Sequence, residues 1–297
     1  MAEPTSASPQ VSPDLTARIA RLFVYPVKSC AGVELREALL TETGFDLDRA
    51  WMVVDEEGVF VTQRELPRMA LIRPQLKLTE VVLRAPGMLA LHLAIDSVDA
   101  AAPTPVRVWK DTVAAYDMGG VAAQWFSDFL GRKLRLVRFD PEQRRLSSTR
   151  WTGGVEAANQ FADGFPLLVA SEGSLAMLNE KLAAAGHAAV GIERFRPNIV
   201  LAGIEAHDED HAATFDIATE EGTVQLKPVK PCPRCPIPDV DPATAETGHA
   251  VRDTLQTYRR DERVGGGITF GMNSIILQGE GQTLRVGQPV TANLDFA

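Results

Sequence analysis

Roughly the first 115 residues consist of short apolar segments that are separated by proline, glycine or acidic turns. Turns at this spacing exclude long helices. Within each segment the apolar residues alternate with polar ones or run together, without the ~3.6-residue period of a helix. Such segments are typical of β-strands. The strands expected in this part cover residues 19–27, 34–41, 51–55, 59–62, 71–78, 81–84, 89–95 and 106–109.

Two amphipathic helices are expected after these strands. In residues 121–130 the large apolar side chains share one face, and Gly131 follows them, as at many helix ends. In residues 172–185 leucines recur at helical spacing, and Ser171 is a suitable N-cap. Further strands are expected at residues 166–170, 199–201, 215–217, 224–226, 275–277 and 290–294, with a short helix near 251–259.

The polar stretch from Gln143 to Asp163 separates the two long helices and contains the pair Gly153-Gly154. A long polar segment of this kind is typical of a loop, and here it is expected to mark a junction between domains. Residues 1–15 are rich in Pro, Ser, Ala and Thr and are expected to form a disordered tail. The predicted fold class is α+β and rich in β-structure.

The charge balance limits the classes of partner. Thirty Lys and Arg residues against 39 Asp and Glu residues give a net charge of -9, so nucleic acid, which needs a basic face, is not expected. No apolar run approaches the ~20 residues that span a bilayer, and the first residues lack the features of a signal peptide. We therefore expect no membrane association and a cytoplasmic location. Three cysteines are too few for a four-thiolate iron-sulfur cluster, so electrons would come from another protein.

Cys232 and Cys235 lie in the segment Lys230-Pro-Cys-Pro-Arg-Cys-Pro-Ile-Pro-Asp239. Proline fixes the backbone, so this segment is expected to be stiff and to present its thiols in a set geometry rather than on a helix. A structural zinc site would lack a second ligand pair, and a dithiol redox couple would lack the helix that it normally opens. Two further interpretations remain, a pair of small buried residues and a single thiolate on a soft transition metal, with Arg234 favouring the charged thiolate.

Several basic motifs accompany the cysteine pair. They are Tyr25-Pro-Val-Lys-Ser29, Asp48-Arg-Ala-Trp51, Thr62-Gln-Arg64, Arg194-Phe-Arg-Pro-Asn198, Asp241-Pro-Ala-Thr244 and Thr257-Tyr-Arg-Arg260. In this order the motifs resemble those of MOSC-domain molybdenum-cofactor proteins with an N-terminal β-barrel domain, similar to the bacterial and mitochondrial amidoxime-reducing proteins. The resemblance covers nearly everything from Ala17 to the end. It implies an N-terminal β-barrel-like domain over residues 16–140 and a MOSC β-barrel domain with a few flanking helices over 141–297.

The resemblance also implies a cofactor site. Cys235 would be the protein ligand to molybdenum, with pterin dithiolate and oxo groups supplying the rest of the coordination sphere. Lys28, Ser29 and Arg49 match the positions that hold the phosphate of the pterin, for which a Lys charge, a hydroxyl and a forked Arg are suited. The other positions that would contact the pterin or flank the metal are Asp163, Gly164, Phe165, Arg196, Asn198, Pro233, Arg234 and Asn273.

Other motifs are expected to play no part in this site. Cys30 is expected to be a buried small residue. The acidic run His207–His211 is expected to be a solvated loop rather than a metal site. The glycine-rich segment Gly265–Gly271 is followed by strand-like residues instead of a helix, so no dinucleotide site is expected. Arg64 is left with two interpretations, the cofactor channel or an ordinary ion pair.

The predicted function is a molybdenum-cofactor-dependent oxidoreductase that reduces N-hydroxylated or N-oxygenated compounds, such as hydroxylamines, hydroxylated nucleobases and amidoximes. Electrons would come from a separate partner, a ferredoxin-like protein or a flavin reductase, because the ferredoxin-like domain that many bacterial relatives append is not expected here. An alternative from another class is a carrier that holds molybdenum cofactor or sulfur on Cys235. A scaffold without cofactor is the third hypothesis, and the basic motifs together with Cys235 argue against it.

Overall fold

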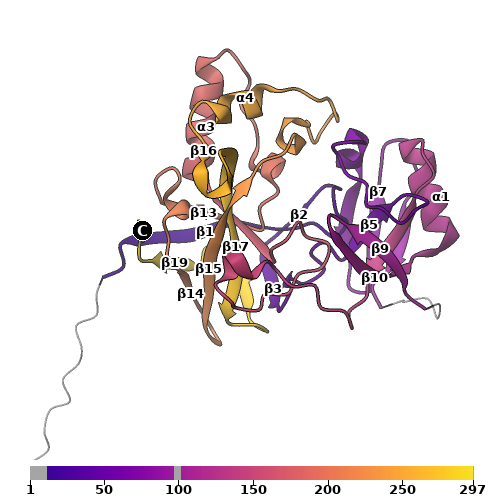
Figure 1. The fold of residues 1–297 in the computed structure, drawn as a ribbon, viewed down its shortest axis with the longest axis horizontal. Coiled ribbons are helices and arrows are strands. Elements are labelled where there is room, and N and C mark those ends of the chain that lie inside the picture. Colours follow the sequence, from indigo (N-terminus) through magenta and orange to yellow (C-terminus); the bar gives the residue numbers. More distant parts are fainter. Residues whose placement is uncertain (1–11, 97–101, 297) are drawn as a thin grey trace, which may run out of the picture.

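Seven strands close a barrel in the computed structural model, which describes residues 12–96 and 102–296 (Figure 1). Around the ring they are β12 (Leu167–Ser171), β13 (Ile199–Ala202), β1 (Leu15–Val24), β19 (Pro289–Ala292), β14 (Phe215–Thr219), β15 (Gly222–Pro233) and β17 (Gly267–Gln278). Pairing of β12 with both β13 and β17 closes the ring. Only the β12–β13 pairing in this ring of described strands is parallel.

Strand β15 bends along its length because its register against β17 shifts at three places. Two of these irregularities involve prolines, at Pro228 and between Pro231 and Pro233. Proline cannot donate a ladder hydrogen bond, and it is tolerated inside a sheet mainly at bulges of this kind. The bent end of β15 carries Cys232 and leads directly to Cys235, so the cysteine pair leaves the barrel wall at a fixed angle.

The strands between Trp51 and Phe139 form an open half-barrel beside the closed barrel (Figure 1). One sheet contains β5 (Trp51–Val54), β11 (Arg135–Phe139), β10 (Asp111–Asp117) and β9 (Thr104–Val108), and a second contains β6 (Arg73–Leu76), β7 (Glu80–Arg84) and β8 (Leu91–Ala94). Helix α1 (Gly119–Leu130) packs Trp125, Phe126 and Phe129 into the core of this half. Gly131 ends the helix with φ 71°, which confirms the expected stop.

The strands of residues 15–45 pack with the closed barrel rather than with the half-barrel, although they precede the half-barrel in the sequence. Strand β1 pairs with β13 and β19, and β2 (Val33–Leu35) pairs with β1. Strands β3 (Glu37–Thr41) and β4 (Gly44–Phe45) form a small sheet with β18 (Thr283–Arg285). The strand order of the barrel therefore depends on pairings between the two ends of the chain.

Helices α3 (Glu172–Ala184) and α4 (Ala250–Gln256) pack together on one side of the barrel (Figure 1). Ser171 caps α3, and its hydroxyl accepts a hydrogen bond from Ser174 N–H, as the sequence predicts. The core beneath these helices includes Leu178, Leu182 and two stacked rings, Phe195 and Phe270, whose centroids lie 3.9 Å apart. This core fixes the segment 192–198, which enters β13 and carries two of the predicted site residues.

The β-rich α+β class is confirmed, and several element boundaries differ from expectation. Strands β10 and β11 were not predicted, and residues 59–62 form only isolated bridges instead of a strand. Pro67 starts a 3-10 helix, η1 (Pro67–Leu71), which delays the strand expected from residue 71 until Arg73. The polar stretch 143–163 contains a short helix, α2 (Thr149–Thr152). Of the predicted tail, residues 1–11 lie outside the described residues, while Leu15 already begins β1.

The remaining described elements are the 3-10 helices η2 (Ile192–Phe195), η3 (Asp208–Asp210), η4 (Ile237–Asp239) and η5 (Glu262–Val264), and the short strand β16 (Arg260–Asp261). Among the described residues no helix is both long enough and apolar enough to cross a bilayer.

Candidate functional site

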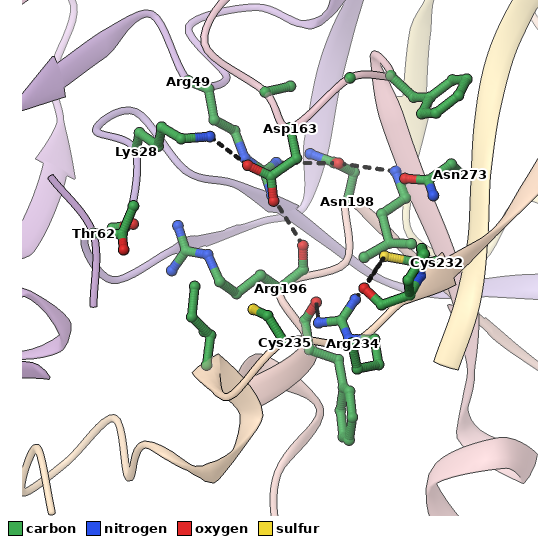
Figure 2. A pocket seen from close by; sticks show the side chains of 18 of the residues that line it. Lys28, Arg49, Thr62, Asp163, Arg196, Asn198, Cys232, Arg234, Cys235 and Asn273 are labelled. Carbon is green, nitrogen blue, oxygen red and sulfur yellow. Dashed lines mark hydrogen bonds and ion pairs between the residues drawn. The ribbon is translucent and has the colours of Figure 1, made fainter. Parts of the chain in front are cut away.

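All twelve residues singled out from the sequence line one cleft, which encloses about 760 Å³ counting the mouth that opens to solvent. Five segments form most of its walls (Figure 2). One follows β1, three come directly before β5, β12 and β13, and the fifth continues from the end of β15. The twelve are Lys28, Ser29, Arg49, Asp163, Gly164, Phe165, Arg196, Asn198, Pro233, Arg234, Cys235 and Asn273. Their assembly in one place follows from the fold, whereas their roles toward a cofactor stay a prediction.

Three of these residues have left-handed backbone conformations without being glycine. The φ angles are 65° at Ser29, 51° at Arg49 and 57° at Arg196. This region is uncommon for residues with a Cβ and costs about 1 kcal/mol or more each, and such conformations cluster at functional sites. The three residues come from different parts of the chain and all line the cleft.

Arg49 is held by a network that fixes its guanidinium. Nη1 donates to Asp48 Oδ2 at 2.6 Å and to Asn198 Oδ1 at 3.2 Å, and Nη2 donates to the carbonyl oxygen of Arg196 at 3.1 Å. Asp48 is buried, and its other oxygen accepts from the Tyr25 N–H at 2.8 Å. Asn198 also accepts from Leu168 N–H and donates to the carbonyl oxygen of Phe23. The Asn198 side chain therefore positions Arg49 and has little capacity left for a ligand.

The Tyr25 ring supports two cationic side chains. The guanidinium carbons of Arg49 and Arg196 each lie 4.3 Å from the ring centroid, within the range of cation–π contacts. Arg196 Nη1 donates to the carbonyl oxygen of Cys30 at 2.5 Å, while Nη2 is buried without a hydrogen-bond partner among the described residues. Burial first, and then the charge of Arg49, lowers the pKa of Arg196 to about 10, so the side chain is charged at neutral pH.

Lys28 and Asp163 form an ion pair across the cleft. Lys28 Nζ donates to Asp163 Oδ1 at 2.5 Å and to the carbonyl oxygen of Phe161 at 2.8 Å, and Trp109 Nε1 donates to the same Asp163 oxygen at 3.1 Å. Burial lowers the pKa of Lys28, and Asp163 offsets part of this. Crowding by protein atoms acts to raise the pKa of Asp163, but the attraction of Lys28 outweighs it and holds that pKa below its usual range. The side chain of Asp163 is still 66% exposed, so solvent weakens the pair.

The two cysteines of the pair differ in their surroundings. Arg234 Nη1 donates to Cys232 Sγ at 2.9 Å, and its Nη2 donates to the carbonyl oxygen of Phe195 at 2.8 Å. The sequence predicts that Arg234 flanks the metal and favours a charged thiolate, and in the structure the thiol that its guanidinium contacts is that of Cys232. Among the described residues nothing forms a hydrogen bond to the Cys235 thiol, which is partly buried in the wall of the cleft (Figure 2).

The remaining predicted residues form the far wall. Asn273 Nδ2 donates to the carbonyl oxygen of Lys230 at 3.3 Å, across the β15–β17 pairing. The ammonium of Lys230 lies 5.8 Å from the Phe165 ring centroid and 5.2 Å from that of Trp151. A Cβ added at Gly164 would meet nothing within 4 Å, so no close packing requires glycine there.

The cleft is strongly basic in a chain whose net charge is -9. Five basic side chains and a single carboxylate line it, namely Lys28, Arg49, Arg64, Arg196, Arg234 and Asp163. Arg64 lies 4.7 Å over the Trp109 ring and has no ion pair with another described residue. The structure therefore favours the channel interpretation of Arg64 over the surface ion pair. Such a concentration of cations attracts an anionic ligand.

Sequence reasoning missed several residues of this site. Asp48 lies in the motif Asp48-Arg-Ala-Trp51, and its position next to Arg49 could have indicated that the two side chains pair. Trp109 and Phe161 meet Lys28 and Asp163 only through the fold, so the sequence carried no local signal for them. Other lining residues that were not assigned are Thr62, Ala162, Leu167, Leu168, Phe195 and Ile237.

The acidic run His207–His211 is not the solvated loop that the sequence predicted. Glu209 is fully buried, and its carboxylate accepts from the hydroxyls of Ser171 at 2.9 Å and Ser174 at 2.6 Å. Asp210 is paired with Arg259 at 2.5 Å. These partners satisfy the hydrogen-bonding capacity of the buried side chains. No cluster of three or more metal-ligating side chains occurs among the described residues. Cys30 is buried as expected, and burial raises its thiol pKa to about 12.

Comparison with known proteins agrees with this architecture. Residues 16–133 match the family model of the MOSC N-terminal beta barrel domain, and residues 156–291 match the MOSC domain. The mitochondrial amidoxime reducing component 2 of Homo sapiens is 35% identical over 81% of this chain and 72% of its own length. The mitochondrial amidoxime-reducing component 1 of Mus musculus is 35% identical over 92% and 81%, respectively. The molybdenum cofactor sulfurase of Bos taurus is 27% identical over 87% of this chain and 30% of its own length.

The cleft, the barrel that carries it and these relatives all agree with the resemblance seen in the sequence motifs. The chain therefore belongs to the family of MOSC-domain proteins with a MOSC N-terminal β-barrel domain, which includes the mitochondrial amidoxime-reducing components.

Proposed function

We propose that this protein is a molybdenum-cofactor-dependent oxidoreductase that reduces N-hydroxylated or N-oxygenated compounds with electrons from a separate donor. The observation that carries the proposal is the combination, in one cleft, of five basic side chains with the Cys235 thiol, to which no described residue forms a hydrogen bond. A cofactor with an anionic phosphate and a thiophilic metal would use both features. The names of the amidoxime-reducing relatives support the reaction class.

The residues present fit such a cofactor. Arg196 Nη2 and Arg234 Nε are buried donors without partners among the described residues, and a buried orphan donor is costly unless a ligand satisfies it. Arg49 is fixed by Asp48 and Asn198, so its planar fork is oriented before any anion arrives. A soft thiolate ligand such as that of Cys235 suits a thiophilic transition metal better than Mg²⁺ or Ca²⁺.

The chain's own groups then have distinct tasks. Lys28, Ser29 and Arg49 would hold the phosphate, Arg196 would donate to the pterin, and Cys235 would bind the metal. The cofactor, when bound, supplies a metal centre that takes up and returns two electrons. Asp163, Gly164, Phe165 and Asn273 would border the pterin, and Asn198 acts through Arg49.

Arg234 is proposed to hold the cysteine segment still rather than to act on the metal ligand. Its two hydrogen bonds, to Cys232 Sγ and to the carbonyl oxygen of Phe195, join the end of β15 to the segment before β13. Pro233 and Pro236 restrict the backbone on either side of the Arg234-Cys235 dipeptide. The Cys235 thiol is therefore pre-positioned, which reduces the entropy lost when a metal binds.

The electron donor is proposed to be a separate protein, a ferredoxin-like protein or a flavin reductase. The basic cleft mouth in an otherwise acidic chain offers complementary charge to an acidic donor. Rates of reduction should then fall as added salt screens the encounter. With NADH alone the purified protein should show no turnover, whereas a chemical viologen donor should restore it.

Two cysteine variants test the proposal, with protein prepared in a host that makes molybdenum cofactor. We expect Cys235→Ser to abolish reduction of an N-hydroxylated substrate by a viologen donor, because a hydroxyl is a harder and weaker ligand than a thiolate. The matched variant Cys232→Ser should retain activity, since its hydroxyl still accepts the hydrogen bond from Arg234. Molybdenum content and pterin fluorescence are measured on both.

Three outcomes would contradict the proposal. Equal loss of activity in the two variants would indicate a dithiol couple. Wild-type protein that is free of pterin but carries labile sulfur on Cys235 would indicate the carrier function. Wild-type protein with neither molybdenum nor labile sulfur would indicate a scaffold.

A further inference from the structure

A row of aromatic rings and basic side chains borders the basic cleft, and we call it the rim. Its members come from four separate segments, which are the residues before η1, the turn between β9 and β10, helix α2 and strand β15. They are Arg64, Trp109, Lys110, Arg150, Trp151 and Lys230. Of these six described residues only Arg64 lines the cleft itself, so the proposed cofactor site leaves the others without a role.

The half-barrel supplies the first part of the rim. Trp109 and Lys110 form the two-residue turn between β9 and β10, and both side chains are exposed. The guanidinium of Arg64 lies 4.7 Å from the Trp109 ring centroid, and Trp109 Nε1 donates to Asp163 Oδ1 at 3.1 Å. Because Asp163 precedes β12 of the closed barrel and lines the cleft, the turn of the half-barrel reaches the cleft wall.

The closed barrel and α2 supply the second part. The ammonium of Lys230 lies 5.2 Å from the ring centroid of Trp151 and 5.8 Å from that of Phe165. The guanidinium of Arg150 lies 5.5 Å from the Trp151 centroid. Phe165 lines the cleft and follows Asp163 by two residues. This short segment of the cleft wall therefore joins the two parts into one continuous surface.

The rim carries uncompensated positive charge. Its four cations form no ion pair with another described residue, and they are Arg64, Lys110, Arg150 and Lys230. The carboxylates beside them in the sequence or in contact with the rim already have partners: Asp163 is paired with Lys28, Asp111 with Arg145 and Glu65 with Arg132. Tryptophan and arginine are also the residue types that contribute most binding energy at protein interfaces. In a chain of net charge -9, such a surface suits an acidic protein.

We propose that the rim is the docking surface of a small, acidic iron–sulfur electron carrier. This inference rests on the proposed function and names the place where its donor binds. Reduction of an N–OH group to N–H consumes two electrons and two protons and releases one water, so a one-electron carrier must dock, leave and dock again. Electron-transfer encounters of this kind use small interfaces, and exposed charges speed the association without making it permanent.

Charge reversal at the rim tests the proposal. The double variant Lys110→Glu/Arg150→Glu changes two exposed residues that lie outside the cleft. With a reduced plant-type ferredoxin as donor, which is small and acidic, kcat/KM for the ferredoxin should fall about tenfold or more at low ionic strength. The difference from wild type should shrink at about 1 M salt, where the Debye length is about 3 Å. With a viologen donor, which needs no docking surface, kcat/KM should stay within about twofold of wild type.

The matched control is Arg18→Glu/Arg36→Glu, which makes the same change in net charge at exposed residues of β1 and of the segment before β3. Neither residue lines the cleft. The control should keep kcat/KM for ferredoxin within about twofold of wild type. An equal loss in both double variants, or no loss in the rim variant, would overturn the inference while viologen-driven reduction leaves the proposed function intact. Failure of ferredoxin to donate to a wild type that accepts electrons from viologen would overturn it as well.

A binding measurement separates this inference from the proposed function. Calorimetric titration with oxidised ferredoxin at low ionic strength follows docking without turnover, and the rim variant should bind about tenfold more weakly than the control variant. If the loaded wild type reduces the substrate with neither donor, the proposed function fails. The docking surface then still stands if the rim variant alone loses affinity, and it fails if wild type does not bind ferredoxin or if the two variants bind alike.

Discussion

Asp163 partly neutralises the basic cleft, and its removal should make the cleft a better anion site. The carboxylate occupies Lys28, one of the three residues proposed to hold a phosphate, through a 2.5 Å contact. Asp163→Asn keeps the shape of the side chain and an oxygen that can accept from Lys28 and Trp109, but removes the charge. We expect inorganic phosphate to bind the variant about five times more tightly than it binds wild type.

The magnitude follows from the position of the carboxylate. A phosphate bound to Lys28 would lie within roughly 4 Å of Asp163, where two unit charges repel by about 4 kcal/mol at an effective dielectric constant near 20 and by about 1 kcal/mol in water. Because the Asp163 side chain is 66% exposed, the lower figure applies, although Lys28 itself is only 7% exposed. A difference of about 1 kcal/mol corresponds to roughly a fivefold change in affinity.

The assay is calorimetric titration of cofactor-free protein with phosphate at neutral pH and low ionic strength. Glu221→Gln is the control, since it makes the same change in net charge at an exposed turn outside the cleft. An unchanged or weaker affinity in Asp163→Asn would refute the reasoning, because Lys28 would then not belong to the anion site. An equal gain in Glu221→Gln would assign the effect to net charge alone.

Two further predictions concern packing and pH. A Cβ at Gly32 would lie 2.5 Å from Tyr25 Cε1, so Gly32→Ala should shift the Tyr25 ring that contacts Arg49 and Arg196. We expect the free energy of unfolding, measured by urea denaturation, to fall by about 1–3 kcal/mol, and phosphate binding to weaken. The control is Gly120→Ala in α1, where a Cβ would meet nothing within 4 Å, and it should not destabilise the chain. Burial, then the charge of Asp210, raises the pKa of Glu209 to about 7, so the folded protein keeps a proton that the unfolded chain releases near pH 4.5. The free energy of unfolding should therefore fall by on the order of 2 kcal/mol as the pH rises from 5 to 8. Glu209→Gln should abolish this fall, as measured by denaturation curves at the two pH values. An unchanged pH dependence in the variant would contradict the assignment.

Local chemistry explains which parts of the fold could be predicted from the sequence. Gly131 and Ser171 mark helix ends through interactions within a few residues, and both predictions are confirmed. Strand β10 was missed because its sequence, Asp-Thr-Val-Ala-Ala-Tyr-Asp, contains alanines and terminal aspartates, which are poor strand formers. The pairing of β1 with β13 and β19 could not be predicted, because pairing between distant segments leaves no local pattern.

The site shows the same limit. Motifs identified the residues that meet in the cleft, but not which side chains pair with each other. Contact of Arg234 with Cys232, and of Lys28 with Asp163, depends on side-chain directions set by bulges and left-handed turns at non-glycine residues. Such turns are uncommon outside glycine, Asn and Asp, so sequence reasoning had no signal for them.

The place of β1 in the barrel determines when the cleft can form during synthesis. Its partners on either side are β13, which ends at Ala202, and β19, which ends at Ala292, so the pairing of β1 is complete only after residue 292 has been synthesised. Pairings between such distant segments form slowly, because the loop between them must close first. Tyr25 and Lys28 follow β1 directly and take their places only when the ring closes. Any cofactor is therefore acquired only after β19 has been synthesised and has paired with β1, and a fragment that begins after residue 24 would lack both the barrel and the anion site.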